Sequence, residues 1–169
     1  LGKIIPKPYE PNPITEWGVK YEDVAIQVYE ELYNVKVLDF GLIPHPEFKA
    51  FGASPDGICD DTGNDEYVGR MVEIKCPPQR KIIPGEVPEH YMPQLQLCME
   101  ILDLEEADFI QYKPAETNWP LPEEFDVVNV KRDRDWWKTN LPIMRAFWDK
   151  VLYFREHLDE LPPPKLKKT

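Results

Sequence analysis

The sequence has little of what disulfide-rich, zinc-ribbon and membrane proteins need. It contains only three cysteines, Cys59, Cys76 and Cys98, and no CxxC motif. An odd number of scattered cysteines excludes a disulfide framework and a zinc ribbon, and it indicates a reducing compartment. No segment is long and apolar enough to span a membrane, and no signal peptide is visible. We therefore expect a cytoplasmic or nuclear protein that is not secreted and has no membrane partner.

Positive charge is also scarce. The chain has 20 Lys and Arg against 31 Asp and Glu, which gives a net charge of −11. This balance argues against a nucleic-acid partner, because phosphate binding requires a basic face. Two considerations weaken this argument against nucleic acid. Bound divalent metals offset the charge of the carboxylates that hold them, and a small basic patch can bind phosphate on an otherwise acidic protein. We expect that patch at Arg80, Lys81, Arg132, Arg134 and the basic tail 162–169.

The length of the chain favours a single domain, 1–169. Its 169 residues are enough for one domain with a proper core and hardly enough for two. The 19 prolines cluster in segments that we interpret as loops or chain ends. Because the chain begins with Leu1 rather than Met, we expect an upstream region to be missing.

Hydrophobic periodicity predicts a mixed α/β fold, with a central mixed sheet flanked by helices. A helix should begin near Thr15, which is suited to cap it, and bury a stripe formed by Tyr21, Val24, Ala25, Val28 and Leu32. The other expected elements are strands at 35–38, 48–53, 57–59, 67–75, 107–112 and 125–130 and helices at 91–102 and 133–161. The segment 76–90 is too long for a mere connection, so it is a candidate functional loop.

Two short motifs contain the residues that suit chemistry. In GASPDG, Asp56 lies in a tight turn at the end of a strand, and in MVEIKCP the side chains of Glu73 and Lys75 project from the same face of the next strand. If these strands pair, two acids and one amine converge. Carboxylates and the carbonyl of Ile74 can hold Mg²⁺ or Mn²⁺, and an adjacent ammonium can orient water or offset charge on a phosphate. The set therefore suits metal-assisted phosphodiester hydrolysis.

Each motif alone has a simpler interpretation. Acid-x-Lys on a strand is more often an exposed ion pair, and SPDG is more often just a turn. The combination is more specific. The segments EWGVKYEDVA, GASPDG, EIKCP and YMPQLQ, in this order, resemble the consecutive motifs of the lambda-type phage exonucleases, the viral recombination nucleases of the PD-(D/E)xK superfamily. The resemblance covers residues 16–112 and implies a restriction-endonuclease-like core at about 15–112. It does not extend beyond Tyr112, and the strand and long helix at 125–161 are expected from periodicity alone.

The resemblance implies a role for each matching residue. Asp56 and Glu73 bind one metal, Glu22 with Asp56 helps a second, and Lys75 is the catalytic lysine. Gln94 corresponds to a glutamine near the active site, although Gln96 is an alternative. Without the resemblance, Glu22 would be interpreted as a solvated helix residue.

The resemblance also implies how the end of a DNA strand is recognised. Ser54 and Arg80 are near positions that recognise the 5′-phosphate in the family, with Lys81 interchangeable with Arg80. His45 and His90 have no ligand-like partner and are interpreted as loop residues, and Cys76 as a packing thiol. Three cysteines cannot supply the four ligands of the iron–sulfur cluster that some superfamily members carry.

The implied function is Mg²⁺-dependent exonuclease action on double-stranded DNA ends, with Mn²⁺ as a substitute. Degradation from the 5′ end would leave 3′ single-stranded tails for recombination, in the host cytoplasm or nucleus if the chain is viral. The implied partners are DNA ends, a single-strand annealing protein and a homotrimer, although the N-terminal part that contributes to a trimeric ring is short or absent here. The alternatives are a restriction-like or repair endonuclease of the same superfamily and a non-catalytic DNA-binding scaffold.

Overall fold

A computed structural model describes residues 12–161 of the chain. These residues divide into two compact units, 12–134 and 135–161, and each is described by itself. The basic tail 162–169 that we expected to contribute positive charge lies outside the described residues. The expectation of a single domain stays a prediction.

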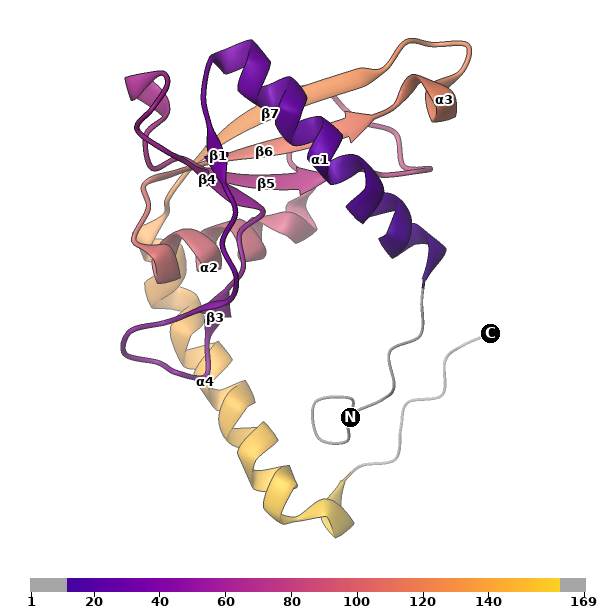
Figure 1. Ribbon diagram of the computed structural model, residues 1–169. Coiled ribbons are helices and arrows are strands. Elements are labelled where there is room, and N and C mark those ends of the chain that lie inside the picture. Colours follow the sequence, from indigo (N-terminus) through magenta and orange to yellow (C-terminus); the bar gives the residue numbers. More distant parts are fainter. Residues whose placement is uncertain (1–11, 162–169) are drawn as a thin grey trace. The chain divides into compact units, whose positions relative to one another are not determined.

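A five-stranded mixed sheet forms the centre of the unit 12–134 (Figure 1). Its strand order is β1-β4-β5-β6-β7, where β5 and β6 are parallel and the other neighbours are antiparallel. The strands are β1 (Val37–Leu38), β4 (Gly57–Cys59), β5 (Met71–Lys75), β6 (Glu106–Lys113) and β7 (Glu124–Lys131). A separate antiparallel pair is formed by β2 (Ile43–Pro44) and β3 (Gly52–Ala53). The mixed α/β fold predicted from periodicity is confirmed.

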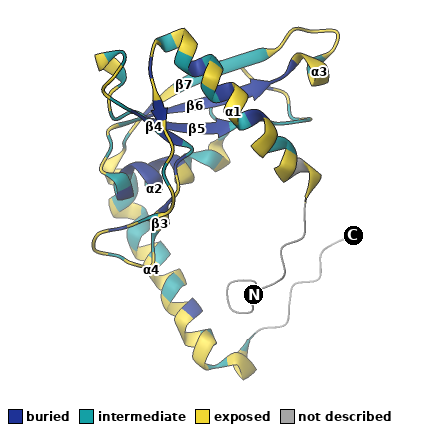
Figure 2. Cartoon of the chain, in the orientation of Figure 1, coloured by how far each residue is buried: buried dark blue, intermediate teal, exposed yellow. Residues whose placement is uncertain are grey.

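Helices cover the two faces of this sheet. Helix α1 (Pro13–Tyr33) packs on the face that carries Val72 and Ile74, whereas α2 (Met92–Leu102) packs on the face that carries Met71. This division follows from the alternation of side chains along β5. Figure 2 shows the buried residues concentrated in the sheet and on the sides of α1 and α2 that face it. The first turn of α2 contains Pro93, as expected, because no backbone donor is lost there.

The buried stripe of α1 differs from the prediction. Val24 is 37% exposed and Leu32 is 62% exposed, whereas Tyr29 is fully buried beside Ala25. The tyrosine can be buried because its hydroxyl donates a hydrogen bond to the Asp108 carboxylate at 2.6 Å. The predicted cap is also wrong, since the helix begins at Pro13 and Thr15 therefore lies in its first turn.

Most other elements lie near their expected positions, but the segment 67–75 is only half a strand. Its first part forms a 3₁₀ turn, η1 (Asp65–Tyr67), and Gly69 has a φ of 74°, which an extended strand does not allow. The pair β2–β3 is shorter and differently placed than the expected strand 48–53. A 3₁₀ turn, η2 (Glu89–Tyr91), precedes α2, and the short helix α3 (Ala115–Asn118) was not expected.

The unit 135–161 is helical. It contains most of α4 (Arg134–Glu156), which includes Pro142, and the 3₁₀ turn η3 (Leu158–Glu160). The predicted helix is confirmed, and it ends earlier than expected. None of the helices in the described part of the chain is long and apolar enough to cross a membrane.

Candidate active site

The candidate site lies where β4 and β5 part. The two strands pair only at Gly57–Val72 and Ile58–Met71, so the edge of β5 is open beyond Val72. There the N–H of Ile74 donates a hydrogen bond to Asp56 Oδ2 at 2.6 Å. Because the N–H and C=O of one strand residue point the same way, the carbonyl of Ile74 faces the same opening. The Asp56 carboxylate thus takes the place of a strand neighbour.

Gly57 explains why the SPDG turn ends in glycine. A Cβ at this position would lie 2.1 Å from Val37 Cγ1 and 3.2 Å from the Leu38 carbonyl oxygen. Only a residue without a side chain lets β4 approach β1 this closely. The glycine therefore fixes the position of the turn that holds Asp56.

Glu73 and Lys75 form an ion pair on one face of β5, as predicted. Glu73 is only 1% exposed, and its Oε1 accepts hydrogen bonds from the Lys75 ammonium and, at 2.7 Å, from Gln94 Nε2. Its Oε2 is buried and has no hydrogen-bond partner among the described residues. A buried carboxylate oxygen without a donor is costly, and a cation would remove that cost.

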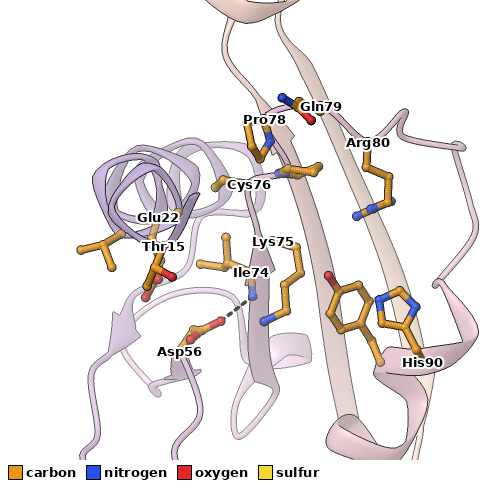
Figure 3. A pocket seen from close by; sticks show the side chains of 14 residues that line it. Thr15, Glu22, Asp56, Ile74, Lys75, Cys76, Pro78, Gln79, Arg80 and His90 are labelled. Atoms are coloured by element: carbon orange, nitrogen blue, oxygen red, sulfur yellow. Dashed lines mark hydrogen bonds between the residues drawn. The ribbon is translucent and has the colours of Figure 1, made fainter. Parts of the chain in front are cut away.

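A pocket of about 610 Å³ opens beside this ion pair (Figure 3). Among its lining residues are five of the predicted site residues, Glu22, Asp56, Ile74, Lys75 and Arg80. Glu73 and Gln94 do not line it. Glu73 is linked to the pocket through Lys75 and through its interaction with Asp56, and Gln94 is linked to it through Glu73. Figure 3 shows Glu22 on the helix at one side, Asp56 and Lys75 at the centre and Arg80 on the loop at the other side.

Sequence reasoning did not select three further residues that line the pocket, Thr15, His90 and Tyr91. The Lys75 ammonium lies 5.4 Å from the centre of the Tyr91 ring, and the His90 and Tyr91 rings are 4.0 Å apart. Tyr91 opens the YMPQLQ motif, which was a signal in the sequence, but nothing in the sequence distinguished Thr15 or His90 from ordinary helix and loop residues.

The acids of the site interact electrostatically. Burial and the neighbouring Asp56 raise the pKa of Glu22 to about 7. Burial also raises the pKa of Asp56 and of Glu73, although the Ile74 N–H and the Lys75 ammonium oppose these shifts. Burial alone would lower the pKa of Lys75, but Glu73 and Asp56 outweigh it and raise that pKa. Three acids therefore share one ammonium, and the site lacks positive charge.

This donor set fits a hard divalent cation. Among residues 12–161 no three Asp, Glu, His or Cys side chains already surround a common point. The available donors are nevertheless all hard oxygens, namely the free Oε2 of Glu73, the Asp56 carboxylate, the Glu22 carboxylate and the carbonyl of Ile74. Carboxylates that repel one another stay apart without a cation between them. The residues present therefore fit Mg²⁺ or Mn²⁺.

Arg80 contributes the cationic wall of the pocket. Its Nη2 is buried and has no hydrogen-bond partner among the described residues, while Nη1 makes one long bond of 3.4 Å to the Lys81 carbonyl. Lys81 is exposed and does not line the pocket, so the structure distinguishes the two residues that the sequence left interchangeable. Ser54 is exposed and also lies outside the pocket.

Other residues weighed from the sequence have structural partners. The expectation of a positive patch at Arg132 and Arg134 is wrong, because Arg132 binds Glu100 and Asp103 and Arg134 binds Glu105. These pairs neutralise the guanidinium groups.

The two glutamines that were alternatives differ in their partners. Gln96 is buried and bonds only backbone, donating to the Lys131 carbonyl and accepting from the Asp133 N–H. Gln94 is therefore the glutamine that touches Glu73.

Cys76 is buried, and burial raises the pKa of its thiol to about 12, as suits a packing residue. The His45 ring accepts bonds from the N–H groups of Glu47 and Phe48 within its own loop.

Comparison with known proteins identifies the class. The fold and the motifs are those of the lambda-exonuclease-like PD-(D/E)xK family. The model of the YqaJ-like viral recombinase domain matches residues 3–105, and the chain belongs to this family. An uncharacterized protein of Acanthamoeba polyphaga mimivirus, R354, is 35% identical over 116 residues, which are 63% of this chain and 21% of that protein. The chain thus spans about a fifth of the length of this relative.

Three solved structures that match the chain are structures of exonucleases. The crystal structure of an alkaline exonuclease from Laribacter hongkongensis, LHK-Exo, is 25% identical with a TM-score of 0.70, over 89% of this chain and 74% of that chain. LHK-Exo in complex with dAMP matches with a TM-score of 0.74, over 92% and 77%. A phage-related exonuclease from Haemophilus somnus 129PT, 15% identical with a TM-score of 0.60 over 95% and 79%, shares the fold.

Proposed function

We propose that this chain is a metal-dependent DNA exonuclease that degrades one strand of a double-stranded end from its 5′ terminus. The observation that carries this proposal is the buried Glu73 carboxylate, which binds Lys75 and Gln94 through one oxygen and leaves the other without a donor, close enough to Asp56 for the two carboxylates to repel each other. The kinship with LHK-Exo, an alkaline exonuclease whose structure with dAMP is known, supports DNA as the substrate. Polarity, 3′-tailed products and a role in recombination follow from the family.

The metal site would be formed by Asp56, Glu73 and the carbonyl of Ile74, and Glu22 with Asp56 would help hold a second ion. A bound divalent cation supplies Lewis-acid polarisation of the phosphate and a more acidic water. Gln94 helps to hold the Glu73 side chain through the bond to Oε1, which leaves Oε2 available to a cation. Mn²⁺ can substitute for Mg²⁺ because all four donors are oxygen.

Lys75 is the proposed catalytic lysine. Its ammonium is held by Glu73 and faces the pocket, and the raised pKa keeps it charged at neutral pH. A fixed positive charge here can orient a water and offset the charge that develops on the scissile phosphate.

Arg80 is proposed to bind the 5′-phosphate, since its buried Nη2 is a donor in need of an acceptor on the wall of the pocket. Guanidinium groups bind phosphate oxygens through paired hydrogen bonds. Ser54 remains a second candidate for this phosphate, although in the structure its side chain is outside the pocket.

The test is a time course on linear duplex labelled at either the 5′ or the 3′ end, with Mg²⁺ and with EDTA. We expect early release of the 5′ label, no cleavage in EDTA, and a loss of at least about a hundredfold in rate for Lys75→Ala, measured per folded molecule because the variant leaves the buried Glu73 without its ion pair and should be less stable. Lys36→Ala, at an exposed surface ion pair, is the matched control. Full activity of Lys75→Ala would remove the proposed chemistry.

A circular plasmid separates this proposal from its alternatives. An enzyme that needs a DNA end leaves the closed circle intact, whereas a restriction-like or repair endonuclease linearises it. A DNA-binding scaffold cleaves neither substrate. A homotrimer and a single-strand annealing partner are further proposals that follow from the family, and light scattering of the purified chain tests the first.

A further inference from the structure

We propose that Asp126, Gln111 and Lys113 are positioning residues that hold the loop 76–90 on the sheet, so that Arg80 faces the pocket and the enzyme distinguishes 5′-phosphorylated from 5′-hydroxyl ends. This inference rests on the proposed function. The three residues come from β6 and β7, two strands that lie on the other side of β5 from Asp56. None of them lines the pocket.

Asp126 ties the far part of the loop to β7. Both of its carboxylate oxygens lie within hydrogen-bond distance of the Gly85 N–H, at 3.1 and 3.2 Å. Gly85 has a φ of 76°, a conformation that glycine adopts without strain and other residues do not. A charged acceptor on a backbone N–H makes a stronger bond than a neutral one, so this contact can fix a loop that has no strand or helix before Glu89.

Gln111 makes the adjacent contact from β6. Its side chain is fully buried, and its Nε2 donates to the Glu86 carbonyl at 3.1 Å and lies 3.5 Å from Asp126 Oδ2. A buried amide that donates a hydrogen bond to the backbone of a loop fixes the position of that backbone relative to the sheet. Ile82, which is also buried, anchors the middle of the same loop by packing.

Lys113 holds the part of the loop that carries Arg80. Its side chain is buried, and its ammonium donates a bond of 3.4 Å to the Arg80 carbonyl. Within residues 12–161 it forms no ion pair with a carboxylate. Lysine is rarely buried without an acidic partner. The bond to the Arg80 carbonyl is therefore the polar contact that compensates the burial of Lys113. Lys113 thereby holds the backbone of Arg80 against β6, while Nη2 of the guanidinium remains available to an anion.

The contacts of Asp126 with Gly85 and of Lys113 with Arg80 both affect the position of the Arg80 guanidinium. Figure 3 shows the Arg80 side chain extending from the loop toward the space above Lys75. If the tie at Gly85 is lost, the loop gains freedom and Arg80 spends less time in the orientation that binds phosphate. The cost appears in recognition of the phosphorylated end and much less in the chemical step at Lys75.

The experiment compares kcat/KM on linear duplex with 5′-phosphate and with 5′-hydroxyl ends, for the full chain with Mg²⁺. We expect Asp126→Ala to lower the ratio of the two values about tenfold, mainly through KM for the phosphorylated end, because a charged hydrogen bond to the loop is lost. Asp126→Asn keeps an acceptor for the Gly85 N–H and should retain most of the ratio. Asp61→Ala, at an exposed acid in the turn that precedes β5, is the control.

A second pair of variants keeps the inference testable if Asp126→Ala unfolds. Gly85→Ala meets no atom within 4 Å and strains only the local backbone, so it should lower the ratio while lowering the melting temperature by only a few degrees. Arg80→Ala should abolish the preference, and adding Asp126→Ala to it should lower the ratio no further.

Failure of this inference is distinct from failure of the proposed function. Absence of any cleavage by the wild-type chain contradicts both. Cleavage without preference for phosphorylated ends, or a preference that Asp126→Ala and Gly85→Ala leave intact, overturns the positioning role and leaves the nuclease assignment standing.

Discussion

Replacing Glu22 by Gln should remove a defined part of the pH dependence of folding. Burial and Asp56 raise the pKa of the Glu22 carboxyl from 4.5 to about 7. Below pH 4.5 the carboxyl is protonated in both the folded and the unfolded chain and contributes nothing. Between pH 4.5 and 7 the unfolded chain ionises first, so the free energy of unfolding falls as the pH rises, and the full penalty is present above pH 7.

A pKa displacement of this size corresponds to about 3 kcal/mol in the absence of solvent screening. Glu22 is only partly buried, and water reduces the interaction, so we expect about 1–2 kcal/mol. Glu22→Gln should therefore be more stable than the wild type by about 1–2 kcal/mol at pH 7.5 and equally stable at pH 4.5. The gain should accompany a loss of nuclease activity, because the amide is a poor metal ligand.

Urea denaturation in EDTA, followed by tryptophan fluorescence at both pH values, measures this difference. Glu16→Gln, at an exposed acid in the first turn of the same helix, is the matched control and should change neither curve. The reasoning would be refuted by a Glu22→Gln variant whose stability relative to wild type is the same at pH 4.5 and pH 7.5. Mg²⁺ should stabilise the wild type at pH 7.5 more than it stabilises the variant, because a bound cation favours the ionised acid.

Two further predictions concern the stability of the fold. Tyr29→Phe removes the hydrogen bond to the buried Asp108 carboxylate and should lower the free energy of unfolding by about 1–3 kcal/mol in urea denaturation, with specific activity per folded molecule unchanged. Gly57→Ala places a methyl group 2.1 Å from Val37 Cγ1, and we expect a loss of about 1–3 kcal/mol together with reduced activity, because the strand that leads from Asp56 must move. Wild-type thermal stability of either variant would contradict the packing described for it.

Periodicity and turn chemistry were sufficient for the elements that build the site. Strand β5 could be predicted from its alternation, which placed Glu73 and Lys75 on one face, and the helix that carries Glu22 from its spacing of three and four. What the pattern could not give was the break at Gly69, because a single positive φ divides an otherwise strand-like run. Contacts between residues distant in the sequence determine where such a strand begins.

Partner choice accounts for the other differences. Leu32 has the apolar character of a core residue and is exposed, while Tyr29 is polar at one end and is buried with its hydroxyl bonded to the Asp108 carboxylate on β6. Likewise, the sequence pattern indicated that Arg132 contributes free positive charge, but in the fold it forms an ion pair with Glu100. Sequence alone does not show which charges meet. The motifs therefore predicted that Asp56, Glu73 and Lys75 lie close together, whereas the charged surface could not be predicted.

The central claim is that Asp56, Glu73 and the carbonyl of Ile74 together hold a divalent ion. Anomalous diffraction from crystals soaked in Mn²⁺ tests it most directly. The account predicts an anomalous peak about 2.0–2.3 Å from oxygens of all three residues, with Glu73 Oε2 among them, and its loss in Asp56→Asn crystals. No peak at the mouth of the β4–β5 opening, or a peak that persists without the Asp56 carboxylate, would contradict it.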